Sequence, residues 1–358
     1  MTSSEVEDFA FAEGLQEPQR PTSLAEVVQN GSCMGCGACE GFLGTGKVRM
    51  VRGELGRLRP VLSKLSPEEE ARALRACPGA NVATTLEEGV PMHPVVGPVI
   101  SVRKGHAVDP HTRFVAAAGG GLTALAMYLL KAARVDFVLH VTASLPPDTE
   151  DIGPRLSFDA VSLLEGCGSR YAPVAPLRSF QEVLALEKPF AFIGKPCDVN
   201  ALCNLAQLDE RVDRLCLFKL TISCGSYADP PSYEAILRQS GIKADEVEAF
   251  RYRGHGCPGW SPYARAKNGR EVKMDYVDFY YKDIGLRHTY QWRCKMCPDF
   301  LGYQADVTIL DAWPGGPPEH HEKVSDERKH ERDGWILAVA RTARGEALLD
   351  SAAQADAL

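Results

Sequence analysis

The sequence lacks a surplus of basic residues and any biased or repetitive composition. Its 40 lysines and arginines are outnumbered by 47 aspartates and glutamates, so the net charge is −7 over 358 residues. This balance argues against a nucleic-acid-binding protein, which normally carries a basic face or tail. The chain is 45% hydrophobic and 24% charged, which is an ordinary globular balance. We therefore expect a folded protein with a sizeable core.

Signals for secretion or membrane insertion are also missing. The first residues, MTSSEVEDFAFAEG, are acidic and do not show the basic and apolar regions of a secretory signal. The longest uncharged apolar stretch runs from Val115 to Leu130 and contains three glycines. It is shorter than the ~20 residues that a membrane helix needs. We expect a cytoplasmic protein without a transmembrane segment.

Cysteine, in contrast, is plentiful, with 12 residues. In a reducing cytosol this number favours metal binding or redox chemistry over a disulfide framework. The alternative is a set of buried cysteines that act as small hydrophobic residues. The spacing of the cysteines distinguishes between these interpretations.

The apolar pattern predicts helices and strands that alternate from about Val99 onwards. We expect a capped helix at 66–76, a linker at 92–98, strands at 135–142, 190–194 and 215–222, and helices at 122–133, 180–187 and 198–208. Later strands are expected at 250–253, 263–267, 271–274, 306–310 and 335–341, with Asn268-Gly269 as a hairpin turn. This order predicts an α/β fold, α+β overall, with a mostly parallel or mixed sheet.

The first group of cysteines lies in residues 33–40, CMGCGACE. Cys33, Cys36 and Cys39 have the C-x2-C-x2-C spacing that begins a bacterial ferredoxin run, in which a tight loop wraps thiolates around an iron–sulfur cluster. Zinc sites normally take paired cysteines from separate turns. The ferredoxin run would continue with x3-C-P, but here the next cysteine is Cys77, followed by Pro78. We interpret 40–76 as an insertion and Cys77 as the fourth ligand; the alternative is a fourth ligand elsewhere.

The second group combines a C-x2-C pair, Cys294 and Cys297, with two cysteines that follow predicted strands. Cys197 follows the strand FAFIG, and Cys224 follows LCLFKLTI. If these strands are parallel neighbours, both cysteines emerge at the edge where open α/β sheets bind ligands. Four thiolates at that edge suit a second cluster. The alternatives are a zinc ion held by the same four residues, and simple burial of Cys197 and Cys224.

The remaining cysteines have no paired spacing. Cys203 and Cys216 fall within apolar patterns and are expected in the core. Cys167 and Cys257 have no role that the pattern explains.

Two glycine-containing loops are candidates for binding a phosphate. Residues 116–123, AAAGGGLT, precede a predicted buried helix, whose bare N–H groups and dipole attract anions. Residues 166–171, GCGSRY, add a hydroxyl group and an arginine. Neither loop matches a Rossmann or P-loop fingerprint. Close backbone packing is the alternative explanation of the glycines.

Taken together and in this order, the motifs resemble the coenzyme F420 hydrogenase and dehydrogenase beta-subunit family, which includes ferredoxin-dependent reductases of chlorophyll pigments. The resemblance covers roughly residues 30–345. It rests on CMGCGACE, SVRKGH, AAAGGGLTALAMYLL, GSRY, GKPCDVNAL, the end of the Cys224 strand, FRYRGHGCPG and CKMCPDFLGYQADVTILDAWPG.

The resemblance implies two 4Fe–4S clusters and a noncovalently bound FAD. It divides the chain into a loose segment (1–30), a ferredoxin-like iron–sulfur module (31–92), an FAD-binding α/β domain (93–240), a C-terminal α+β domain that completes the second cluster (241–345), and a tail (346–358). It implies that Cys197, Cys224, Cys294 and Cys297 hold one cluster and that Cys33, Cys36 and Cys39 belong to the other, for which the spacing makes Cys77 the expected fourth ligand. The implied flavin contacts are Gly119, Gly120, Gly121, Thr123, Ser169, Arg170 and Tyr171.

This reading predicts an oxidoreductase. Clusters carry single electrons, whereas a flavin accepts one or two and exchanges a hydride. We expect electrons to pass between a ferredoxin-like or other redox partner, the two clusters and FAD, with an organic substrate or a deazaflavin coenzyme as hydride partner. His255, Tyr171 and Lys195 are weak candidates for a proton donor. The alternatives are an electron-relay subunit of a larger complex and a zinc-stabilised binding module.

Overall fold

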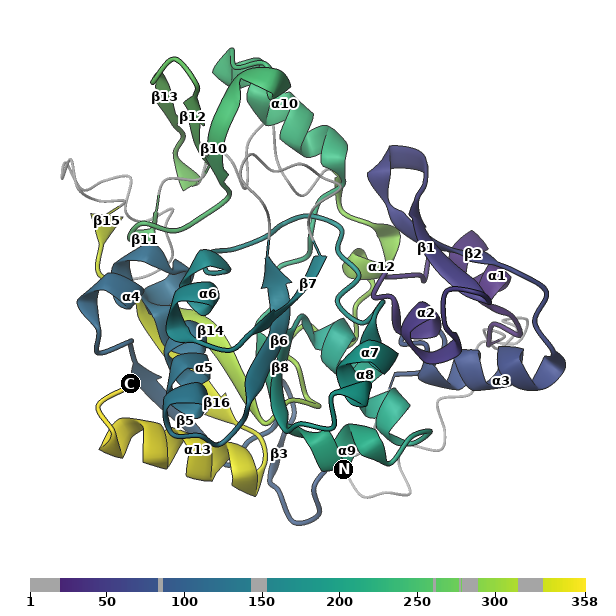
Figure 1. The fold of residues 1–358 in the computed structure, drawn as a ribbon. Helices are drawn as coiled ribbons and strands as arrows, with labels where there is room; N and C mark the ends of the chain where they lie inside the picture. Colours follow the sequence, from purple (N-terminus) through teal and green to yellow (C-terminus); the bar gives the residue numbers. More distant parts are fainter. Residues whose placement is uncertain are drawn as a thin grey trace, which may run out of the picture.

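A large mixed sheet forms the centre of the computed structural model (Figure 1). The structure describes residues 20–82, 86–142, 153–259, 262–276, 278, 289–314 and 331–358. The sheet has seven strands in the order β5-β16-β14-β9-β8-β6-β7. Four neighbouring strands are parallel, namely β6 (Phe137–Thr142), β8 (Phe190–Gly194), β9 (Cys216–Ile222) and β14 (Val307–Ala312). The flanking strands run antiparallel to their neighbours: β5 (Ser101–Gly105), β7 (Gly153–Ser157) and β16 (Trp335–Ala340). The predicted α/β class is confirmed.

Side chains alternate between the two faces of this sheet, as the two-residue period of a strand requires. Phe137 and Leu139 enter one core, whereas Val138 between them enters the other. The first core is covered by α7 (Phe180–Ala185), α8 (Pro196–Ala206) and α9 (Arg211–Leu215). The second is covered by α5 (Gly121–Lys131), α6 (Ala160–Glu165) and α13 (Ala343–Gln354). The short α4 (Pro110–Val115) and η2 (Ala117–Gly120) lead into α5.

A smaller layer lies beside the end of the sheet, at the top of Figure 1. Three antiparallel strands, β10 (Val247–Arg251), β12 (Tyr263–Ala266) and β13 (Glu271–Lys273), pack with α10 (Pro230–Ser240) around a third core. The predicted hairpin between the last two strands is confirmed. The remaining short elements of the C-terminal third are η3 (Ala244–Glu246), α12 (Trp292–Lys295), and the paired strands β11 (Cys257–Pro258) and β15 (Glu331–Arg332).

The N-terminal part folds against the first core. It comprises α1 (Leu24–Gln29), α2 (Ala38–Leu43), β1 (Val48–Arg52), η1 (Glu54–Gly56), β2 (Leu58–Leu62) and α3 (Pro67–Ala76). The predicted capped helix is confirmed, since Ser66 and Glu69 form a reciprocal capping box. The antiparallel hairpin β1–β2 fills much of the predicted insertion. Residues 1–19 of the predicted loose segment lie outside the described residues.

The prediction of a plain linker at 92–98 is wrong. Met92–His93 (β3) and Gly97–Pro98 (β4) pair as a small antiparallel hairpin. The His93 ring accepts hydrogen bonds from the N–H groups of Val95 and Val96, and Gly97 supplies a positive φ of 76°. These turn features were present in the sequence but were not interpreted as a hairpin.

Strands β14 and β16, from the predicted C-terminal domain, lie in the same sheet as the strands of the predicted FAD-binding domain. The boundaries given for the five parts of the chain stay predictions.

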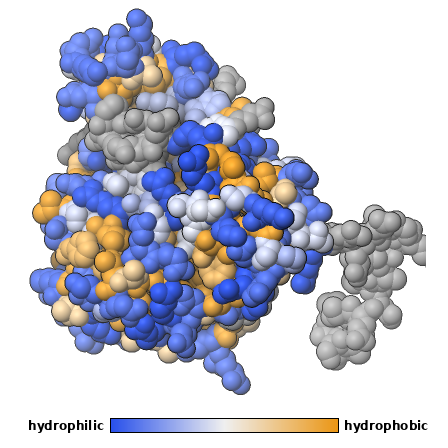
Figure 2. Space-filling model, turned by 45° about the vertical axis from the view of Figure 1, so that its right-hand side comes forward, coloured by the Kyte–Doolittle hydropathy of each residue, from blue (hydrophilic) through white to orange (hydrophobic). Residues whose placement is uncertain are grey.

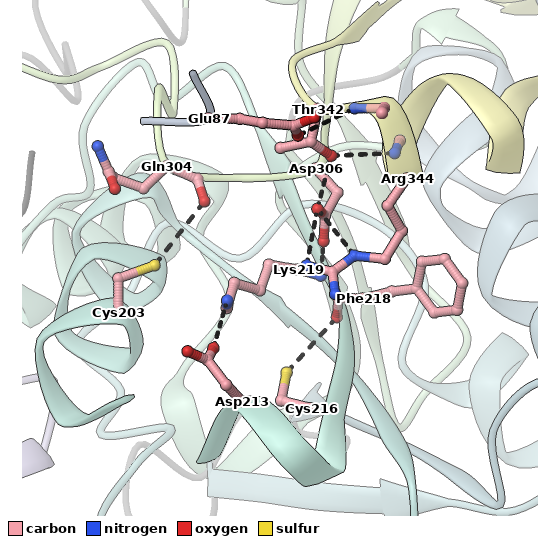
Figure 3. Close-up of polar contacts among 12 residues, drawn as sticks. Glu87, Cys203, Asp213, Cys216, Phe218, Lys219, Gln304, Asp306, Thr342 and Arg344 are labelled. Atoms are coloured by element: carbon pink, nitrogen blue, oxygen red, sulfur yellow. Dashed lines mark hydrogen bonds and ion pairs between the residues drawn. The ribbon is translucent and has the colours of Figure 1, made fainter. Parts of the chain in front are cut away.

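A polar network ties the sheet to α13 (Figure 3). The Asp306 carboxylate is 1% exposed and accepts hydrogen bonds from the backbone N–H of Lys219, the Thr342 hydroxyl and the Arg344 guanidinium. Lys219 in turn donates to Asp213 at 3.0 Å. Because a buried carboxylate is stable only when its oxygens are paired, this network fixes the start of α13 beside β9.

Cys203 and Cys216 flank this network and belong to the hydrophobic core (Figure 3). Their thiols donate weak hydrogen bonds to the carbonyl groups of Gln304 and Phe218. Burial raises the pKa of Cys203 to about 11 and that of Cys216 to about 12. The predicted core location of both residues is confirmed.

The Asp306 network makes a prediction for stability. Asp306→Ala leaves several buried donors without a partner, so we expect it to lower the free energy of unfolding by about 3 kcal/mol. Asp213→Ala removes an exposed partner of Lys219 and should cost less than about 1 kcal/mol. Chemical denaturation of both variants checks this, and equal losses would contradict it.

Candidate functional site

The first group of cysteines surrounds one small cavity. Cys33, Cys36, Cys39 and Cys77 all line it, together with residues of α1, the β1–β2 hairpin and the turn at Pro78. The cavity brings Cys77 to the triplet across the 37 residues that separate it from Cys39. The structure thus gathers the four residues that the sequence assigned to one cluster.

Glycines allow the loop of the triplet to lie against the neighbouring chain. Gly35 and Gly37 have φ values of 72° and 81°, which L side chains rarely adopt. A Cβ atom on Gly41 would lie 1.9 Å from the carbonyl oxygen of Leu177. The N–H of Leu177 also donates to the carbonyl of Cys36 at 3.0 Å. The loop is therefore docked directly on the segment that precedes α7.

The turn after α3 places Cys77 next to Cys33. Cys77 caps α3, and its carbonyl group accepts from the N–H groups of Ala80 and Asn81. A Cβ on Gly79 would lie 2.6 Å from the carbonyl oxygen of Ser32, so this turn packs on the start of the triplet. Burial and, to a lesser extent, the neighbouring Cys33 raise the pKa of Cys77 to about 11.

All four sulfurs of this group are in a setting suited to metal ligation. Burial raises the pKa of each thiol, and the other cysteines of the group contribute to the rise for Cys36, Cys39 and Cys77. Backbone N–H groups directed at the sulfurs oppose this rise; the donors are Gly35, Ala38, Glu40, Gly79 and Ala80. Such N–H groups stabilise negative sulfur and tune bound clusters.

The second group of cysteines gathers at one edge of the sheet. Strands β8 and β9 are parallel neighbours, as the sequence predicts. Cys197 lies in the first turn of α8, directly after β8, and Cys224 lies two residues after β9. Cys294 lies in α12, and Cys297 follows it. Electrostatic interaction joins Cys197 to Cys224 and Cys294, and joins Cys224 to Cys297.

The turn after Cys224 directs donors at these sulfurs. The N–H of Ser226 points to Cys224, that of Tyr227 to Cys294, and that of Asp299 to Cys297. Burial raises the pKa of Cys224 to about 11, and it is the largest cause of the raised pKa at the other three thiols. At Cys197, Asp198 and Lys195 are the leading charged neighbours.

Within the described ranges, no three His, Cys, Asp or Glu side chains are arranged to hold a single metal ion. A zinc ion draws four sulfurs to about 2.3 Å from one point. A cubane cluster spaces its thiolates more widely, because each sulfur binds a different iron. The four cysteines of the first group line a common cavity, and the kind of group that either set would hold stays a prediction.

The two glycine loops lie side by side, and a third loop joins them. The Cys167 thiol contacts the carbonyl of Val115 at 3.7 Å, and Arg251 donates to the same carbonyl at 2.7 Å. The N–H of Gly256 donates to the carbonyl of Phe114, and the His255 ring stacks on that of Phe114 with centroids 5.6 Å apart. Residues 254–259, GHGCPG, therefore form the third loop, which packs against the two glycine loops.

Close packing accounts for each glycine of the AAAGGG loop. Gly119 and Gly120 have φ values of 80° and 75°, and α5 begins at Gly121. A Cβ on Gly119 would lie 2.6 Å from the backbone of Gly334, and one on Gly121 would lie 2.3 Å from Ile336. The packing alternative thus explains these glycines, and their contact with a flavin stays a prediction.

Two guanidinium groups converge at the second glycine loop. A Cβ on Gly168 would lie 3.5 Å from a guanidinium nitrogen of both Arg170 and Arg251. Burial lowers the pKa of Arg170, and the neighbouring Arg251 lowers it further. The Arg170 Nε is buried and has no hydrogen-bond partner in the part of the chain that the structure describes. Adjacent cations with an unused donor provide a setting for an anion.

A third arginine is committed to structure. Arg253 is 4% exposed and forms a bidentate ion pair with Asp311, both distances being 2.8 Å. Its Nε donates to the carbonyl of Pro258, and another nitrogen contacts the Cys257 sulfur at 3.8 Å. Cys257 thus has a packing role that its spacing did not reveal.

The three candidates for a proton donor lie in different places. Tyr171 packs edge-on against Tyr252, and His255 lies on the third loop beside the glycines. Lys195 lies with the second cysteine group instead, where its ammonium contacts Asp198 at 2.6 Å. Sequence reasoning missed Arg251, although the motif FRYRGHGCPG that contains it was noted.

Large apolar side chains are exposed around the C-x2-C pair. Trp292 is 62% exposed, Met296 61% and Phe300 50%. Figure 2, in which the right-hand side of Figure 1 comes forward, shows patches of hydrophobic surface between hydrophilic ones. Apolar residues exposed close together in sequence are typical of an interaction surface.

Family models match most of the chain. The model for the N-terminal part of the coenzyme F420 hydrogenase/dehydrogenase beta subunit matches residues 102–181, and the model for its C terminus matches residues 187–358. The chain belongs to this family. The resemblance inferred from the motifs is confirmed, and the chain is a member of an oxidoreductase family that carries iron–sulfur clusters.

Individual relatives agree with this family. The chain is 24% identical over 254 residues to the coenzyme F420 hydrogenase subunit beta of Methanococcus voltae, covering 67% of this chain and 76% of the relative. A chain in the structure of the F420-reducing [NiFe] hydrogenase complex from Methanosarcina barkeri matches with a TM-score of 0.56 and 17% identity. That match covers 74% of this chain and 82% of the other, and it shows a shared fold.

The first cysteine group precedes the part of this beta-subunit-family chain that the family models match, whereas the second group and the glycine loops lie inside it. Among the described residues, none of the helices combines the length and the apolar character needed to cross a membrane.

Docking of the first cysteine loop can be tested at Gly41. Gly41→Ala forces a Cβ against Leu177, so we expect a loss of at least about 2 kcal/mol of stability from overpacking. The matched control is Gly46→Ala, because a Cβ on Gly46 meets nothing within 4 Å. Thermal unfolding and iron content measure the outcome. Equal stability and iron content in the two variants would show that the loop is not docked as described.

Proposed function

We propose that this chain is an iron–sulfur flavoprotein oxidoreductase with two 4Fe–4S clusters and one FAD. The observation that carries the proposal is the gathering of eight cysteines, all at least partly buried, into two groups of four, within a chain of the coenzyme F420 hydrogenase/dehydrogenase beta-subunit family. Cys33, Cys36, Cys39 and Cys77 would hold one cluster. Cys197, Cys224, Cys294 and Cys297 would hold the other.

The flavin would lie at the three converging loops. Arg170 and Arg251 supply adjacent positive charges, which suit the pyrophosphate of FAD. The expected contacts Gly119, Gly120, Gly121, Thr123, Ser169 and Tyr171 lie on or next to two of these loops. The negative charge of the pyrophosphate would neutralise the positive charges of Arg170 and Arg251.

Bound clusters supply single-electron transfer, and a bound flavin supplies hydride exchange. The cysteines fix the clusters, the arginines orient the dinucleotide, and the buried setting excludes water. Tyr171 and His255, which lie on or beside these loops, would be the candidates for delivering a proton there. A coenzyme F420-type deazaflavin or another organic molecule would be the hydride partner, because relatives are named for that coenzyme.

An electron-relay role within a larger complex is the second candidate. The relatives are named as hydrogenase subunits, and Trp292 and Met296 expose apolar surface beside the second cysteine group. A partner docked there would exchange electrons close to that group. Turnover of substrate by the isolated chain with reduced ferredoxin or dithionite supports an autonomous reductase, whereas turnover only after a partner is added supports the relay.

Anaerobic purification tests the cofactor content. We expect about eight irons, eight sulfides and one FAD per chain. Cys197→Ser should remove one cluster and leave the N-terminal one, whereas Cys203→Ser, a change at a core cysteine, should leave both. A wild-type chain with zinc and no sulfide would refute the proposal.

The flavin site has its own test. Arg251→Met removes one charge-assisted contact, so the dissociation constant of FAD should rise by about tenfold or more. The control Arg238→Met changes an exposed arginine on α10 and should leave the affinity unchanged. Fluorescence titration measures both, with inorganic pyrophosphate competing for the wild-type site. Unchanged affinity in Arg251→Met would place the flavin elsewhere.

A further inference from the structure

We propose that Tyr227 is a positioning residue that joins the two cysteine groups into one electron-transfer unit, with Lys195 and Asp198 beside it at the junction. The inference rests on the proposed function and extends it. Neither the motifs nor the family match assigns a role to Tyr227, which follows Cys224 by three residues.

Tyr227 contacts both groups. Its side chain is 2% exposed, and its hydroxyl donates to the carbonyl of Met34 at 2.8 Å. Met34 lies between Cys33 and Cys36 in the first group. The backbone N–H of the same tyrosine is directed at the sulfur of Cys294 in the second group. One residue therefore links a ligand of one group to the ligand loop of the other through covalent bonds and two hydrogen bonds.

The charged pair beside Tyr227 confirms that the groups are neighbours. Asp198 is 1% exposed and interacts electrostatically with Cys36 of the first group and with Cys197 of the second. The Lys195 ammonium lies 2.6 Å from Asp198 and 5.7 Å from the centre of the Tyr227 ring. It balances the charge of Asp198 and offers positive charge to thiolates at the junction.

Separate contacts hold the N-terminal part in this position. Arg57 forms an ion pair with Asp229 at 2.6 Å, at the start of α10. Arg59 donates to Gln291 at 3.0 Å, directly before α12. Asp229 and Gln291 are both almost fully buried. Because Arg59 lies on strand β2 and Arg57 directly precedes that strand, the N-terminal part is fixed against the elements that surround the second group.

Clusters held by the two cysteine groups would exchange single electrons across this junction, and a ferredoxin-class carrier would supply the electron. No bond would form or break, because one cluster would be oxidised as the other is reduced. Tyr227 contributes by holding the Cys33–Cys36 loop at a fixed distance and by providing a bonded route. It is not a catalytic residue, because it touches neither substrate nor flavin in this assignment.

The test compares wild type with Tyr227→Phe in the full, cluster-loaded chain under anaerobic conditions. Removal of the hydroxyl leaves the ring and all eight cysteines in place, so the iron and sulfide content should not change. The magnetic interaction between the two reduced clusters, seen in electron paramagnetic resonance, should weaken. The rate of electron equilibration after rapid partial reduction should fall severalfold. Tyr303→Phe is the matched control, since it too removes a tyrosine hydroxyl that donates to a backbone carbonyl, at Val95.

Three results decide the matter. Unchanged coupling and rate in Tyr227→Phe, with both clusters present, would overturn the role of Tyr227. If Tyr227→Phe loses a cluster, the wild-type chain still provides the test. Eight irons in wild type, with no magnetic interaction between the two reduced clusters, would refute the claim that the two groups form one electron-transfer unit. A wild-type chain with no iron would instead refute the proposed function, so the two failures are distinguishable.

Discussion

Burial of sulfur is the constraint on which the arrangement of this molecule depends. Eight cysteine thiols lie in two groups, and desolvation is the largest cause of the raised pKa at every one of them. Hydrophobic packing alone gives no reason to group cysteines or to aim backbone N–H groups at their sulfurs. A metal cluster gives both reasons, because its ligands must be thiolates and thiolates need donors when they are removed from water.

The fold meets this constraint by bringing distant segments to one edge of the sheet. The parallel order of β8 and β9 places Cys197 and Cys224 together, and α12 returns Cys294 and Cys297 to the same place. The N-terminal part brings its own four cysteines and packs them on the same core. The glycine loops converge separately, around Arg170 and Arg251. Family membership agrees with this organisation, and the first cysteine group is an addition outside the matched region.

The sequence predicted the parts of this structure that short-range patterns determine. Short apolar runs located β8 and β9 within a residue, and Ser66-Pro67 located the start of α3. The spacing of the triplet and the Pro78 that follows Cys77 indicated a group that the structure does gather. The hairpin β3–β4 was missed because its strands have only two residues each, which is too short for a periodic signal.

Long-range contacts were beyond the reach of such patterns. Arg251 and Arg253 lie two residues apart in one motif, yet one meets a glycine loop and the other pairs with Asp311. Tyr227 shows the same limit, since its link to Met34 spans 193 residues. No local spacing encodes such partners; they follow from the order of strands in the sheet and from the docking of the N-terminal part.

Mössbauer spectroscopy of the anaerobically isolated chain, grown on enriched iron, addresses the central claim most directly. The account predicts that essentially all iron is present as 4Fe–4S clusters, in the amount that two such clusters require. Spectra of isolated iron ions, each bound by four sulfurs, would contradict it. So would half that amount of cluster in a chain whose Cys33, Cys36, Cys39 and Cys77 remain free thiols.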